Sequence, residues 1–127
     1  IDAIDSLNAK CCLIEELCRR GIPFVSSMGA ALKTDPSCIK TARLNQTKNC
    51  GLSRLLRRRL KRRGVDLQSV RCVYSDEQAV LPGGGICPAE EKGTRNILGS
   101  LPTITAIFGL TVANEAIKQL SGYKTVK

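Results

Sequence analysis

The opening thirty residues restrict the kind of sheet that this chain can form. Residues 1–5 (IDAID) have the pattern of a short buried strand that ends in acidic side chains. Asp5 or Ser6 can cap a helix with an apolar face, and Gly21 is placed to end it. Residues 22–25 then predict a second short buried strand. A strand, a helix and a strand in this order form a βαβ unit, so we expect a parallel strand pair with a right-handed crossover.

The middle of the chain adds further elements to this unit. Residues 38–44 and 70–75 have the composition of strands, and residues 51–63 form a helical pattern with one leucine stripe. Residues 76–98 are rich in Pro and Gly and predict a long loop, which in a compact domain is usually functional or disordered. The expected fold class is therefore α/β, a Rossmann-like mixed sheet flanked by helices.

A final helix follows this loop. Ser100 is the expected cap, and Pro102 suits the first turn. The first half of the helix is apolar all round, so we expect it to be buried on every side. The apolar stretch is too short to insert into a membrane, because a spanning helix needs about 20 apolar residues.

The chain has no histidine and seven cysteines. An odd number of cysteines, without any C-x-x-C pair, is a poor disulfide framework and a poor zinc site. Without histidine, this chain alone cannot supply Ser-His or Cys-His catalysis. We expect a reducing compartment, namely the cytoplasm, with an organelle as the open alternative.

The formal net charge is +9, and one segment holds most of it. Residues 54–63 contain seven basic residues and no acidic one, so a single helix carries the positive field. Such a run is commonly a solvated face, but it can also neutralise the phosphates of a nucleic acid. The helical spacing turns Arg59 and Arg63 toward the leucine stripe, where they can reach an acidic partner. The candidate phosphate contacts are Arg54, Arg57, Arg58, Lys61 and Arg62.

Asp5 is the candidate metal ligand. It lies where a buried strand ends and a helix begins, and ligands of open α/β sheets gather at that edge. A carboxylate there can hold Mg²⁺ beside a nucleotide triphosphate. The alternative is that Asp5 only caps the helix, and the local pattern leaves both open.

Several short motifs together resemble one superfamily. They are Asp2-Ala3-Ile4-Asp5-Ser6 with Lys10, Val25-Ser26-Ser27-Met28-Gly29-Ala30, Asp35-Pro36, the Leu- and Arg-rich helix, Val73-Tyr74-Ser75 and the closing helix over residues 99–120. In this order they resemble the ThiF/MoeB/HesA (ubiquitin-activating-enzyme-like) superfamily, and most closely its branch of tRNA threonylcarbamoyladenosine dehydratases.

The resemblance implies an activity and a set of residues. It implies that Asp5 binds Mg²⁺ and ATP for adenylation, with Ser6 and Lys10 at the same nucleotide site. In this branch the adenylated group is the threonylcarbamoyl carboxylate on tRNA, which is then cyclised with loss of water. The implied partners are ATP, tRNA, a second copy in a homodimer and a sulfur-transfer protein.

The resemblance also places the chain within a larger domain. The superfamily's phosphate-binding glycine loop belongs to its N-terminal half, and residues 1–127 match the C-terminal part of the adenylation domain. We therefore expect this piece to be inactive alone.

Two other functions and one thiol stay open. A sulfur-carrier adenylyltransferase would act on a small ubiquitin-like protein, although the missing C-x-x-C pairs and the basic helix argue against it. A non-catalytic RNA- or protein-binding module would keep only the fold. Cys87, in the long loop, is either the reactive thiol that relatives keep on a crossover segment or an incidental cysteine.

Overall fold

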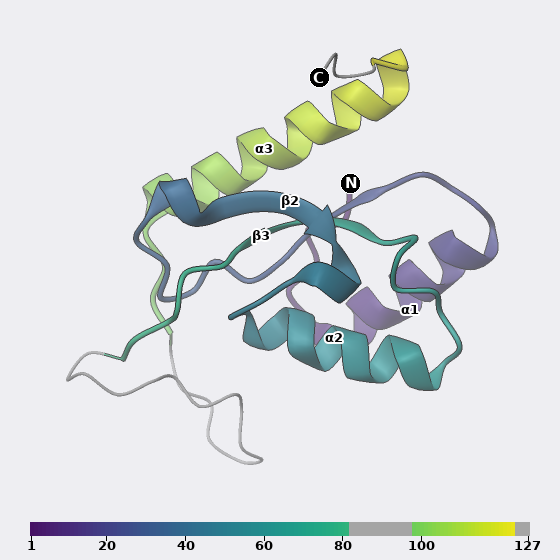
Figure 1. Ribbon diagram of the computed structural model, residues 1–127, viewed down its shortest axis with the longest axis horizontal. Coiled ribbons are helices and arrows are strands. Elements are labelled where there is room, and N and C mark those ends of the chain that lie inside the picture. Colours follow the sequence, from purple (N-terminus) through teal and green to yellow (C-terminus); the bar gives the residue numbers. More distant parts are fainter. Residues whose placement is uncertain (82–97, 124–127) are drawn as a thin grey trace.

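The centre of the molecule is a three-stranded mixed sheet. The computed structural model describes residues 1–81 and 98–123, and its strands have the order β1-β3-β2 (Figure 1). β1 (Val25–Ser27) runs parallel to β3 (Arg71–Ser75), whereas β2 (Ile39–Arg43) pairs with β3 in the antiparallel direction. The prediction of a mixed α/β sheet flanked by helices is confirmed.

Helices cover both faces of this sheet. α1 (Leu7–Arg19) and α2 (Gly51–Arg62) lie side by side on one face, and α3 (Pro102–Ser121) lies on the other (Figure 1). Two short 3₁₀ turns, η1 (Pro36–Cys38) and η2 (Leu44–Gln46), flank β2. The result is three layers, with the sheet in the middle.

The molecule has two hydrophobic cores, one on each face of the sheet, and the central strand β3 contributes side chains to both. Successive side chains of a strand point to opposite faces. Cys72 and Tyr74 accordingly pack into the core beneath α1 and α2, while Val73 packs into the core beneath α3. The α3 core is completed by Val25, Ile104, Phe108 and Val112.

All three helices run antiparallel to the two parallel strands. We call the edge where β1 and β3 end the carboxyl edge, and the opposite one the amino edge. α2 begins at the carboxyl edge, where Leu52 lies against Gly29 just past β1. α3 also begins there, because the Leu32 N–H donates a hydrogen bond of 3.0 Å to the Gly99 carbonyl. The helices therefore end at the amino edge.

The expectation that the first half of α3 is buried on every side is wrong for the described residues. Ile104, Phe108, Val112 and Glu115 form one buried stripe against the sheet. Apolar residues on the opposite side are exposed, including Leu110 (71%), Ile117 (62%) and Leu120 (87%). The sheet contacts only one side of the helix. The apolar composition suggested burial on all sides, but no other described element packs against the far side. No helix in the described ranges is long and apolar enough to cross a membrane.

Three predicted boundaries also differ. The strand predicted at residues 22–25 begins at Val25, since Pro23 has no N–H for strand pairing and Ile22 is 45% exposed. The strand predicted at residues 1–5 is reduced to one bridge between Asp2 and Ser26. The N-cap of α3 is Leu101 rather than Ser100.

Candidate functional site

The first candidate site lies at the carboxyl edge, where residues 1–3 run beside β1. The Asp2 N–H donates to the Val25 carbonyl at 2.9 Å, and the Ser27 N–H donates to the Asp2 carbonyl at 2.8 Å. This pairing is parallel, so the chain leaves the sheet beyond Asp2 at the same edge as β1. Asp5 therefore lies at the carboxyl edge, just before α1.

The Asp2 carboxylate is the centre of a buried polar cluster, which we call the Asp2 cluster. It accepts hydrogen bonds from Ser26 Oγ at 2.6 Å and from the Ile4 N–H at 3.1 Å. It also forms an ion pair with Lys10, with 2.8 Å between Nζ and Oδ2. Both charged side chains are 0% exposed. The cluster ties the start of the chain, β1 and α1 together.

The Asp2 cluster fixes the backbone immediately before Asp5. Ile4 donates its N–H to the Asp2 carboxylate and accepts a 3.3 Å hydrogen bond from Lys10 Nζ at its carbonyl. Both polar groups of this residue's backbone are thus held from inside the protein. The backbone that leads into Asp5 is therefore held in one position, although the side chain of Asp5 is exposed.

Asp5 does not cap the helix. The N-cap of α1 is Ser6, whose side chain makes no capping hydrogen bond. Among the described residues, the Asp5 carboxylate has neither a hydrogen-bond donor nor a cation as its partner. An exposed carboxylate on a rigid backbone at the carboxyl edge is suited to bind a ligand from solution.

Lys10 has a different environment from the one expected for a nucleotide contact. Its ammonium is fully buried and is shared between the Asp2 carboxylate and the Ile4 carbonyl. In this structure Lys10 supports the position of Asp5. A direct contact between Lys10 and a nucleotide stays a prediction.

The donor set at Asp5 fits Mg²⁺ bound together with a nucleotide. The described residues contain no group of three or more His, Cys, Asp or Glu side chains that could hold a metal ion. Magnesium, however, is commonly bound by one or two carboxylates, with substrate phosphates and water completing its coordination. Asp5 can be that carboxylate.

A second polar cluster at the carboxyl edge was missed by the sequence analysis. Lys33 is buried, and its ammonium donates to the Asn49 carbonyl at 3.0 Å and to the Glu77 carbonyl. Burial lowers the pKa of Lys33. Burial raises the pKa of the Glu77 carboxyl, but hydrogen bonds from Asp35 and Thr34 outweigh it and lower that pKa overall. These contacts fix the chain where it leaves β3.

The second candidate site is the outer side of α2. Arg54, Arg58, Lys61 and Arg62 recur at helical spacing and are exposed. In the part of the chain that the structure describes, none of them has an acidic partner. We call these four residues the basic stripe. Residues 54 and 62 are about 12 Å apart along the helix axis, at 1.5 Å per residue.

The other cations of α2, and Arg63 at its C-cap, are held by the protein itself. Arg63 pairs with Glu15 on α1 at 2.5 Å, which confirms that it reaches an acidic partner. Arg59 donates to the side chain of Asn8. Arg57 was expected among the phosphate contacts, but its guanidinium donates to the Thr47 carbonyl at 2.8 Å and to the Thr47 hydroxyl. In the structure, Arg57 fastens η2 to α2.

The cysteines of the described residues are free thiols. Burial raises the pKa of Cys72 to about 12, so this thiol is inert at neutral pH. Cys87 lies outside the described residues, and its role stays a prediction.

Open α/β sheets bind their ligands at the carboxyl edge of the parallel strands, which is where this chain places its acidic motif. The chain matches the ThiF family over residues 1–127. It belongs to the ThiF family.

Several of its curated relatives are named as dehydratases of one tRNA nucleoside. It is 35% identical to the tRNA threonylcarbamoyladenosine dehydratase of Escherichia coli, over 94% of this chain and 50% of the relative. It is 31% identical to tRNA threonylcarbamoyladenosine dehydratase 2 of Saccharomyces cerevisiae, over 95% of this chain and 30% of the relative. The chain therefore spans half or less of the length of these relatives.

Solved structures agree with this result. The E. coli dehydratase TcdA in complex with ATP superimposes with a TM-score of 0.77 and 32% identity, over 95% of this chain and 46% of the other. The AMP complex of TcdA gives a TM-score of 0.73 and 29% identity, over 94% of this chain and 46% of the other.

Proposed function

We propose that this chain is the C-terminal part of an ATP-dependent enzyme that adenylates the threonylcarbamoyl carboxylate of threonylcarbamoyladenosine in tRNA and dehydrates it to the cyclic form. Support comes from the family, from relatives named as dehydratases of this nucleoside, and from a similar structure that binds ATP. The main observation behind this proposal is the contrast between the two aspartates of one motif, residues 2–6. Asp2 is buried and fully bonded, whereas Asp5 is exposed and lacks a partner among the described residues.

The chemistry proceeds in two steps. A carboxylate oxygen of the threonylcarbamoyl group attacks the α-phosphate of ATP, and the bond to pyrophosphate breaks. A nucleophile within the same group then attacks the activated carbonyl carbon, and AMP leaves with the former carboxylate oxygen. One proton is released, so the nucleoside has lost the elements of water.

The residues of this chain contribute binding and orientation to the first step. Asp5 would hold Mg²⁺, which neutralises part of the triphosphate charge when it is bound. The Asp2 cluster keeps Asp5 in place, since it fixes the backbone of the residue before it. Preorganisation of this kind lowers the cost of aligning the reacting groups.

The direct test is ATP–pyrophosphate exchange by the full-length protein, with and without tRNA that carries threonylcarbamoyladenosine. Exchange that depends on the modified tRNA is the expected result. Exchange stimulated only by a small ubiquitin-like protein would instead indicate the sulfur-carrier activity, and no exchange at all would indicate a binding module.

The basic stripe is the proposed contact with the tRNA backbone. Replacing Arg58 and Arg62 with alanine should weaken binding to every tRNA, whatever its sequence. The slope of log K against log salt is negative, and its magnitude should fall by about 1 for each phosphate that is no longer neutralised. Both residues are exposed, so the folded structure should be preserved. Filter binding at a series of salt concentrations measures both quantities.

Arg57→Ala is the matched control for this prediction. It removes one charge from the same helix, but a charge whose guanidinium is bound to Thr47. It should lower the melting temperature while the salt slope stays close to that of the wild type. An unchanged salt slope in the Arg58/Arg62 variant would rule out the basic stripe as the tRNA contact.

A further inference from the structure

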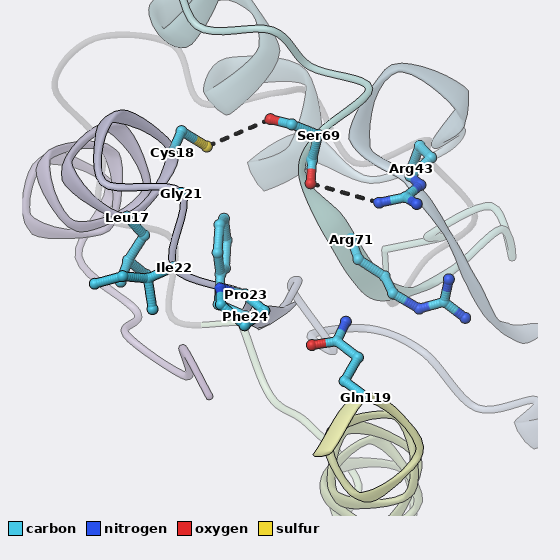
Figure 2. Close-up of a pocket in the computed structure, with 10 residues that line it drawn as sticks. All are labelled: Leu17, Cys18, Gly21, Ile22, Pro23, Phe24, Arg43, Ser69, Arg71 and Gln119. Carbon is cyan, nitrogen blue, oxygen red and sulfur yellow. Dashed lines mark hydrogen bonds between the residues drawn. The ribbon is translucent and has the colours of Figure 1, made fainter. Parts of the chain in front are cut away.

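A cavity lies at the amino edge, away from Asp5. It has a volume of about 240 Å³. One wall is apolar and comes from the end of α1 and the turn before β1, with Leu17, Ile22 and Phe24 (Figure 2). The other wall is polar and comes from the ends of β2 and α3 and the start of β3, with Arg43, Ser69 and Gln119. The nucleotide chemistry at the carboxyl edge does not use this pocket.

The polar wall has more positive than negative charge. Arg71 bonds Glu115, with 2.7 Å between Nε and Oε2, and Lys118 shares the same carboxylate at 3.3 Å. Arg43 is exposed, and its guanidinium has one protein partner in the described chain, the Ser69 carbonyl at 3.5 Å. Two cations thus share one carboxylate, whereas Arg43 has no acidic partner in the described chain and its guanidinium is available to an anion.

The apolar wall contains one aromatic side chain. Phe24 is half-buried, and its ring points into the space between the end of α1 and β3 (Figure 2). A flat base can stack on such a ring while its phosphate binds an arginine, which is how unpaired nucleotides are recognised in RNA. The volume is below the usual range of about 300–1,000 Å³ for ligand pockets, so one base fits better than a whole cofactor.

The turn η2 connects the pocket to the helix that carries the basic stripe. Arg43 immediately precedes η2, and Arg57 bonds η2 to the middle of α2. α2 also ends at the amino edge, which brings Lys61 and Arg62 to the edge that holds the pocket. A strand that follows the stripe can therefore reach Arg43.

We propose that this pocket receives one unpaired nucleotide of the tRNA, with its base against Phe24 and its phosphate on Arg43. This inference rests on the proposed function, because it takes tRNA as the substrate. It assigns a second contact on the RNA, at the edge of the sheet opposite to the adenylation chemistry.

The test uses the full-length protein and a short single-stranded RNA that contains 2-aminopurine, whose fluorescence falls when the base stacks. Arg43→Ala should weaken binding about tenfold, as expected for the loss of a charged hydrogen bond. Phe24→Leu keeps an apolar wall and should lose most of the quenching. Gln119→Ala, at an exposed position, should weaken binding by a smaller factor.

Lys40→Ala is the matched control, since Lys40 lies on the same strand as Arg43 but pairs with Asp76 near the carboxyl edge. It should bind the RNA as the wild type does. Wild-type binding and quenching in Arg43→Ala and Phe24→Leu would overturn the pocket even if tRNA-dependent exchange is found. Displacement of the RNA probe by octanoate but not by a nucleoside 5′-monophosphate would also overturn it, in favour of an apolar carboxylate. Binding of the RNA through these residues without any ATP–pyrophosphate exchange would support the pocket and contradict the proposed dehydratase activity.

Discussion

Asp5→Ala in the full-length protein is expected to lower tRNA-dependent ATP–pyrophosphate exchange by about 10²- to 10³-fold, the usual cost of losing one preorganised electrostatic group. The physical reason is that the triphosphate would lose its metal-binding carboxylate. Asp5 is exposed and has no partner among the residues that the structure describes. The melting temperature should therefore change little, as for other surface substitutions.

One further variant at this position and one control elsewhere test whether the charge of Asp5 is what exchange requires. Asp5→Asn keeps the size of the side chain and removes its charge, so it should behave like the alanine variant. Asp66→Asn removes a charge from another exposed aspartate, in the turn before β3, and should leave exchange unchanged. Exchange that survives Asp5→Ala would remove the proposed role of this residue.

Lys10→Met is expected to destabilise the folded protein by about 3–5 kcal/mol, because it leaves the Asp2 carboxylate buried without its cation. The apolar part of the side chain is retained, so the packing around it changes little. Denaturant unfolding measures the effect as a lower midpoint at constant m value.

The double variant Asp2→Asn with Lys10→Met tests the cause. It removes both charges; the amide oxygen can still accept from the Ile4 N–H, and the amide nitrogen can donate to Ser26 Oγ, so the double variant should recover a large part of the stability. If Lys10→Met were as stable as the wild type but bound ATP more weakly, Lys10 would be a nucleotide contact instead of a support for the backbone.

The order of elements could be predicted from the sequence because each one has a local signal. The period of the apolar residues separated helices from strands, and Gly21 marked the end of the first helix region. The same angular reasoning placed Arg63 near an acidic partner, which proved to be Glu15. It could not separate Arg57 from its neighbours, because Arg57 bonds Thr47 in a turn that has no such period.

The burial of individual residues was harder to predict. An apolar helix does not indicate how many of its sides meet another layer, which is why only one stripe of α3 is covered among the described residues. The role of Asp2 depends on Lys10, eight positions later, and on Ser26 in the next strand. Only the folded βαβ unit brings these three side chains together.

The common direction of the three helices gives the molecule an electrical axis. Peptide dipoles add along a helix, with partial positive charge at its first turn and partial negative charge at its last. The carboxyl edge thus receives the positive ends, which favour the phosphates of a nucleotide near Asp5. The amino edge receives the negative ends, and these stabilise the cations in the last turns, such as Arg19, Arg62 and Lys118. The dipoles thus favour a bound anion at the carboxyl edge, and at the amino edge they favour the cationic side chains that we propose to contact RNA.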